Sequence, residues 1–223
     1  MLASMNPWIF FAGAAVISGL FYVEGLLLAG RFFGVRVREI GIGVGPLAFT
    51  RGRLVVRWLP LGALVYFHDT RFGEDKDPAG SFDHAPRSTR VSIRLMDVLV
   101  YLLPAFLVLG LDAWRSFVSG FGQLFTILVE PTAEGVELVR GFLDIVESGD
   151  VGRAIGIWFA KSAALTAVPF VPVAGGGGVL FELLSRPGAN FQTGTAAALM
   201  VLGALAILAF LVKFVWVFFA AVL

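Results

Sequence analysis

Apolar and polar residues are arranged in long separate blocks along this chain. Four blocks are apolar and long enough to cross a bilayer as helices, which takes about 20 residues. These blocks lie at about 7–30, 95–114, 155–173 and 195–223. The pattern predicts an α-helical polytopic membrane protein with about four transmembrane spans in one domain, 1–223.

The block after the first span has a different pattern. Residues 37–67 are rich in β-branched and aromatic residues, which favour strands. The tripeptide Thr50-Arg51-Gly52 can form a turn between two strands. The block is too apolar for a freely solvated hairpin. We therefore expect a membrane-associated β-hairpin after span one.

The distribution of charge predicts the orientation. Residues 31–94 carry eleven Lys and Arg, whereas residues 115–154 carry three, together with six acids. The positive-inside rule then puts 31–94 in the cytoplasm and both termini outside. Within these loops, 68–94 is predicted to be a mobile cytoplasmic loop. The outer loop, 115–154, contains acids and apolar residues at helical spacing, which predicts a surface amphipathic helix at about 131–147.

Composition agrees with a membrane protein and excludes several classes. Apolar residues make up 58% of the chain and the mean hydropathy is +0.87, whereas soluble domains are about 45–50% apolar. The net charge of +1 and the lack of a basic patch interleaved with aromatics argue against nucleic acid as a partner. The absence of cysteine excludes disulfides and thiolate metal sites. No basic residue precedes the first apolar block, so we expect that block to be a retained span.

Three stretches resemble the intramembrane site-2 metalloprotease family. In that family a span carrying H-E-x-x-H is followed by I-G-x-G-P and L-P-L-G-G-Y-V, and a later L-D-G-G supplies the third metal ligand. The corresponding stretches here are GRFFGVRVREIGIGVGPLAF (30–49), RWLPLGALVYF (57–67) and LTAVPFVPVAGGGGVLFELL (165–184). The resemblance covers most of the chain in the same order. It implies a four-span scaffold with a hairpin after the first span.

The metal site of the family does not carry over. In register with H-E-x-x-H, the histidine positions hold Tyr22 and Leu26, and the glutamate position holds Val23. In the later stretch, Ala174 stands at the metal-binding aspartate position and Thr166 at an asparagine position. A catalytic zinc needs three N or O ligands and an open position for water. The resemblance therefore predicts a pseudoprotease with no catalytic residue, metal or other cofactor.

What remains is a binding role. In the family the hairpin is thought to receive substrate as an added strand, which needs no zinc. We therefore expect a regulatory or structural subunit of another membrane protein in a bacterial cytoplasmic membrane, docking an extended segment on residues 40–67. A hairpin that only packs on the spans is the alternative. The candidate partner-binding residues are Glu24, Ile40, Gly41, Gly43, Gly45, Pro46, Leu61, Gly62, Thr166, Pro169 and Pro172.

Glu24 is an acidic residue inside the first apolar block, 7–30. It lies one position after the catalytic glutamate position, about 100° around the helix. It is therefore not the general base of the family. Two roles stay open: a contact to a partner or a proton path, or an acid near the cytoplasmic end that meets water and arginines such as Arg31.

Two other functions stay open. In a small transporter or channel component, Glu24, Lys161 and Lys213 would line a shared path. Residual enzymatic activity would need another nucleophile, Thr166 or Ser162, although neither has a base nearby in the sequence.

Two further sequence patterns do not match a known metal-binding or phosphate-binding motif. The pairs His68-Asp69 and Asp83-His84 match no zinc spacing, so a solvated loop is the simpler interpretation. The run AGGGG at 174–178 lacks the lysine and hydroxyl residue of a phosphate-binding loop, which leaves a flexible turn between spans.

Overall fold

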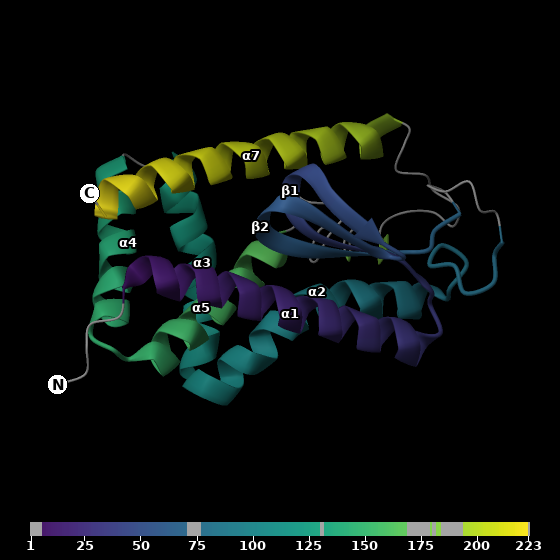
Figure 1. Cartoon of the computed structure of the whole chain (residues 1–223), viewed down its shortest axis with the longest axis horizontal. Helices are drawn as coiled ribbons and strands as arrows, with labels where there is room; N and C mark the ends of the chain where they lie inside the picture. The colour runs from purple at the N-terminus through teal and green to yellow at the C-terminus, as the bar shows by residue number, and fades with distance from the viewer. Residues whose placement is uncertain are drawn as a thin grey trace.

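The computed structural model describes residues 6–70, 77–129, 132–168, 179, 182–183 and 194–222. The chain is mostly helical and carries one small sheet (Figure 1). The long helices α1 and α7 run along the molecule with opposite directions (Figure 1). In chain order the elements are α1 (Pro7–Phe33), β1 (Val37–Arg51), β2 (Leu54–Phe67), α2 (Arg87–Leu109), α3 (Asp112–Val129), α4 (Thr132–Glu147), α5 (Val151–Thr166) and α7 (Gly194–Val222).

Helix α1 confirms the first predicted helix and extends it by three residues. The Asn6 side chain accepts a hydrogen bond from the Trp8 backbone N–H at 2.9 Å, which caps the helix start. Gly34 ends the helix with φ 69°, a left-handed conformation that suits glycine. Its buried residues recur at about every fourth position and form one stripe: Phe10, Ala14, Ser18, Tyr22, Leu26, Ala29 and Gly30. This stripe packs on α2, α4, α5 and β2.

The second predicted span is divided in the structure. Helix α2 begins at Arg87, earlier than expected, and ends at Leu109. Gly110 has φ 57° and ψ −135°, which breaks the helix, and α3 begins two residues later at Asp112. The predicted block 95–114 therefore contains the end of one helix and the start of another. Helix α3 occupies part of the predicted outer loop and was not expected.

Helix α4 confirms the amphipathic helix predicted at about 131–147. Its buried residues, Gly135, Val139, Leu143 and Val146, form one face. That face packs on Val217 and Phe218 of α7 and on Phe10 and Ala14 of α1. The apolar face of α4 is thus covered by protein, whereas the sequence suggested a helix lying on the membrane surface.

Two of the helices, α1 and α2, are long and apolar enough to cross a membrane. Helix α7 coincides with the fourth predicted block, and its described stretch Val212–Val222 is a shorter apolar segment. Helix α5 coincides with the first part of the third block. Four crossings stay a prediction.

The predicted mobile loop after β2 is partly built into the fold. The Arg36 N–H donates to Gly80 O at 2.8 Å, and the Phe82 N–H donates to His68 O at 2.7 Å. Phe82 is buried in a cluster with Val35 and Ile93. The buried Phe82 side chain and these backbone hydrogen bonds hold the polar segment 77–86 against the base of the hairpin. Residues 71–76 lie outside the described part.

Candidate functional site

Of the positions that the sequence resemblance aligns with a zinc site, Tyr22 and Leu26 lie in a closed contact between α1, α2 and β2. Tyr22 and Leu26 of α1 pack with Val100 of α2, and Ala63 and Val65 of β2 adjoin them. Val23 is half-buried beside them. Ala174, the fourth of these positions, lies outside the described residues, as does the run 174–178.

The contact contains a buried acid that the sequence analysis missed. The Tyr22 hydroxyl donates a hydrogen bond to Asp97 Oδ1 at 3.0 Å, and both side chains are buried. The Tyr101 ring stacks on the Tyr22 ring with centroids 5.7 Å apart. The available signal was an acid, Asp97, inside the predicted span 95–114, because acids in membrane segments are rare and face the protein interior.

This arrangement supplies polar groups but not a metal centre. Among the described residues, Asp97 is the carboxylate that bonds to Tyr22, and Leu26 cannot coordinate a metal. Among the described residues, no group of three His, Asp or Glu side chains gathers as a metal site would. The hydrogen bond ties α1 to α2 across 75 positions of sequence. Its evident role is to fix these two helices against each other.

Removing the hydroxyl tests that role. We expect Tyr22→Phe to lower the free energy of unfolding by about 1–3 kcal/mol, because a buried carboxylate loses a donor. Chemical unfolding in detergent measures the change. Tyr66→Phe is the matched control, since Tyr66 is a half-exposed tyrosine of β2, and it should change stability by less than about 0.5 kcal/mol. Equal effects of the two variants would contradict a structural role for the Tyr22–Asp97 bond.

The sheet confirms the hairpin predicted at 37–67, including its turn at Gly52. It is more folded than a plain hairpin, because Ile40, Gly41 and Ile42 pair on both sides: with Val65, Leu64 and Ala63, and with Leu54, Val55 and Val56. Bends allow this arrangement. Gly43 and Gly45 in β1 and Gly62 in β2 have φ of 85°, 91° and 82°, values that favour glycine and are typical of bulges.

The two faces of the β2 end of the sheet differ. Ala63, Val65 and Phe67 face the α1–α2 contact, whereas Leu64 and Tyr66 point to the other face and are exposed. Gly30 of α1 permits close approach, since a Cβ added there would lie 2.9 Å from Phe67 Cε1, and Gly19 lies opposite Ala63. The sheet is therefore packed lengthwise along α1 rather than projecting from its end.

The distal half of β1 is the most open part of the sheet. All residues from Gly45 to Arg51 are exposed, including Pro46, Leu47 and Phe49. Within the described residues this stretch pairs on one side only, with the start of β2. It is therefore an edge of the sheet, and an edge presents unpaired backbone N–H and C=O groups.

The predicted partner-binding residues are thus separated by the structure. Ile40 and Gly41 lie in the centre of the sheet, with strands on both sides, and Gly43 and Gly62 shape its bends. Leu61 belongs to β2. Gly45 and Pro46 begin the open edge. Glu24 lies elsewhere, exposed on α1.

Of the third predicted region, 165–184, the structure describes residues 165–168, 179 and 182–183. Thr166 ends α5, and its hydroxyl donates to the backbone carbonyls of Ser162 at 3.1 Å and Ala163 at 2.9 Å. These bonds are internal to the helix, and among the described residues no base contacts the Thr166 hydroxyl as activation of a nucleophile would need. Pro169 and Pro172 lie outside the described residues.

Lys161 and Glu24, two residues of the transporter hypothesis, do not share a cavity in the described structure. Lys161 of α5 donates to the Ser119 hydroxyl of α3 at 2.7 Å. Glu24 faces outward from α1. Lys213 lies on α7, which packs with α4, α3 and the start of α1. The described positions of Glu24, Lys161 and Lys213 therefore do not support a shared transport path.

The two His–Asp pairs have separate structural roles. The His68 ring Nε2 donates to Asp77 O at 3.0 Å, and His68 and Asp69 are buried. Burial raises the pKa of Asp83, but hydrogen bonds from the Ser81 and Thr70 hydroxyls outweigh it and bring the pKa to about 2. Asp83 is therefore ionised at neutral pH and organises the loop by accepting hydrogen bonds.

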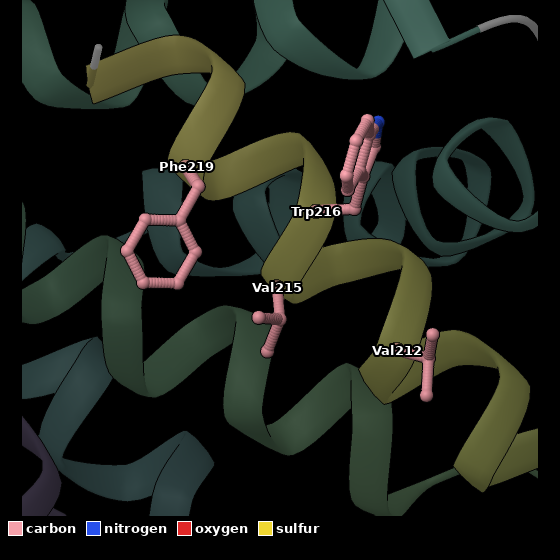
Figure 2. A pocket seen from close by; sticks show the side chains of 4 residues that line it. All are labelled: Val212, Val215, Trp216 and Phe219. Carbon is pink, nitrogen blue, oxygen red and sulfur yellow. The ribbon is translucent and has the colours of Figure 1, made fainter.

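One shallow groove lies on α7. Figure 2 shows its lining side chains, Val212, Val215, Trp216 and Phe219, which project from the outer face of the helix. All four are exposed and apolar, and the groove has a volume of about 530 Å³. Its lining suits hydrocarbon and offers no group for chemistry.

No protein-family model and no curated protein sequence matches this chain.

Proposed function

We propose that this chain is a non-catalytic membrane protein on a scaffold like that of the site-2 proteases. It binds an extended segment of another membrane protein and acts as a regulatory or structural subunit. The observation that carries the proposal is the open edge of β1, residues 45–51, on a sheet that packs along the candidate membrane helix α1.

The edge has the chemistry for strand addition. A partner segment would pair with its backbone groups, which gives affinity without regard to sequence, and Leu47 and Phe49 would contact alternate side chains of the partner. Natural edges are usually blunted by charges or covered by other elements. This one carries its only charge at its end, Arg51, and is exposed along its length.

The position of the sheet beside α1 indicates which kind of protein supplies the bound segment. Because the sheet lies along a membrane helix, an extended stretch next to a membrane span would reach it without leaving the membrane surface. The basic composition of 31–94 favours a cytoplasmic entry to this sheet, whose β2 extends along α1 to Gly19, with both termini outside. The partner of this proposal is thus a membrane protein with an extended cytoplasmic or juxtamembrane stretch.

The loss of catalysis rests on the residues at the former metal site. Tyr22, Val23 and Leu26 replace the ligand and base types, and Tyr22 is engaged with Asp97. We expect the purified protein to bind no stoichiometric zinc within the membrane and to leave a model transmembrane substrate intact. Stoichiometric zinc together with cleavage would contradict the proposal.

Strand addition is tested with a defined peptide. The full chain in lipid nanodiscs is titrated with a fluorescent, extended Val/Thr-rich peptide and with the same peptide N-methylated at alternate residues, which cannot pair its backbone. We expect about tenfold or more weaker binding of the methylated peptide, equivalent to about 1.4 kcal/mol. Phe49→Lys should weaken binding of the parent peptide similarly, because a lysine blocks edges.

Phe125→Lys is the matched control, since Phe125 is an exposed phenylalanine of α3 away from the sheet. It should leave binding unchanged. If both peptides bind equally, or if the two lysine variants behave alike, the edge is not the binding surface.

A further inference from the structure

An outward ridge of α1 carries one charged residue within apolar surroundings. The exposed residues of this helix recur at every fourth position and include Val16, Leu20, Glu24, Leu28 and Phe32. Glu24 lies in the middle of this ridge, with Leu20 57% and Leu28 61% exposed on either side. The ridge points away from the stripe that packs on the rest of the protein.

Glu24 is too deep to be explained by the cytoplasmic end of the helix. It lies seven residues before Arg31, about 10 Å along the axis at a rise of about 1.5 Å per residue. Side chains of a helix lean toward its N-terminus, so the carboxylate leans away from Arg31 and deeper into the apolar section. A carboxylate facing lipid at that depth is costly, and such residues usually have a partner.

The described part of the chain does not provide that partner. Within it, Glu24 makes no hydrogen bond or ion pair. Lys161 is engaged with Ser119 of α3. Because no described residue pairs with Glu24, a partner from another protein would satisfy its charge.

Lys213 is also an unsuitable partner from a second copy. Phe218 of α7 contacts Trp8 and Phe11 near the start of α1, with ring centroids 5.1 and 4.8 Å apart. Helix α7 runs opposite to α1 (Figure 1), so Lys213, five residues before Phe218, is level with about residue 15 of α1. The depths of Lys213 and Glu24 then differ by more than about 10 Å. Two copies inserted in the same orientation would keep this difference.

We propose that the α1 ridge is a docking surface for a transmembrane helix of another protein that carries a Lys or Arg at the depth of Glu24. The apolar residues of the ridge pack on the partner helix, and the ion pair forms where water is excluded and Coulomb attraction is strong. This surface is separate from the sheet edge, and the inference requires only that α1 lies in the membrane.

The test uses the full chain in phosphatidylcholine vesicles with a synthetic Leu/Ala helix of about 20 residues as the probe. One peptide has a single Lys about 10 Å from its cytoplasmic end, and the other has Leu at that position. Energy transfer between a donor on the protein and an acceptor on the peptide reports association. We expect the Lys peptide to associate about tenfold more strongly than the Leu peptide.

Variants assign the effect to Glu24. Glu24→Gln should remove the preference for the Lys peptide, and its unfolding curve should match that of the parent, because Glu24 makes no hydrogen bond or ion pair with the described residues. Glu137→Gln, at an exposed acid of α4, is the control and should keep the preference. Equal association of both peptides, or an unchanged preference in Glu24→Gln, overturns the proposal. Loss of self-association in Glu24→Gln without any peptide preference also overturns it, since the occupant would then be a second copy. Failure of peptide binding at the sheet edge leaves this result unaffected.

Discussion

Arg90→Ala is expected to lower the free energy of unfolding by about 3–5 kcal/mol, because it leaves a buried carboxylate without its counter-charge. Arg90 Nε lies 2.7 Å from Glu182 Oε2, and the two side chains are 16% and 1% exposed. Arg90 also donates to Ala85 O at 2.7 Å, and Arg87 donates to the Glu182 backbone carbonyl at 2.6 Å. The pair thus joins the start of α2 to the segment that precedes α7. Chemical unfolding in detergent measures the loss.

Two further variants separate the ion pair from other effects of the substitution. The double variant Arg90→Leu with Glu182→Leu should recover most of the loss, since no charge stays buried. Arg115→Ala removes an ion pair with Asp112 in which the side chains are 86% and 72% exposed, and it should cost less than about 1 kcal/mol. A loss for Arg90→Ala as small as that for Arg115→Ala would mean that the buried pair does not hold this junction.

Gly25→Ala is expected to destabilise the α1–α2 contact by about 1–3 kcal/mol through overpacking. A Cβ at this position would overlap Val100 Cγ1 and lie 3.1 Å from Val100 Cβ. Valine is stiff because it is β-branched, so the helices themselves would have to separate. The change would also disturb the Tyr22–Asp97 hydrogen bond, which spans the same two helices. Thermal unfolding in nanodiscs is the measurement.

Gly13→Ala is the matched control for this substitution. It lies on the same helix, and a Cβ there would meet nothing within 4 Å. It should be neutral or slightly stabilising, because alanine favours a helix over glycine. Adding Val100→Ala to Gly25→Ala should restore part of the lost stability. If Gly13→Ala and Gly25→Ala behave alike, the close approach of α1 and α2 at Gly25 is not what limits stability.

Local signals predicted several elements well. The start of α1 follows from Asn6 and Pro7, and the two strands and their turn follow from β-branched residues around Gly52. The helix at α4 follows from its periodicity. In each case the residues that form the element also carry the signal for it, so no distant part of the chain has to be known.

The break between α2 and α3 could not be predicted in the same way. Gly110 lies in an apolar run, as do Gly13 and Gly19, which stay inside α1. Glycine permits a positive φ but does not require it, and the packing of the two helices against α5 decides which glycine adopts it. The bends at Gly43, Gly45 and Gly62 have the same origin, and they turn a plain hairpin into a sheet in which residues 45–51 are an exposed edge.

The acidic residues in the apolar blocks separate what the sequence determines from what the tertiary structure determines. The sequence by itself determined that three acids, Glu24, Asp97 and Asp112, lie in apolar blocks, and that Tyr22, Val23 and Leu26 stand where the family resemblance would place H-E-x-x-H. Only the tertiary structure decided that Asp97 is buried against Tyr22 while Glu24 faces outward. The physical reason is that a helix position fixes the direction of a side chain, whereas the neighbouring elements decide whether that direction leads into protein or away from it.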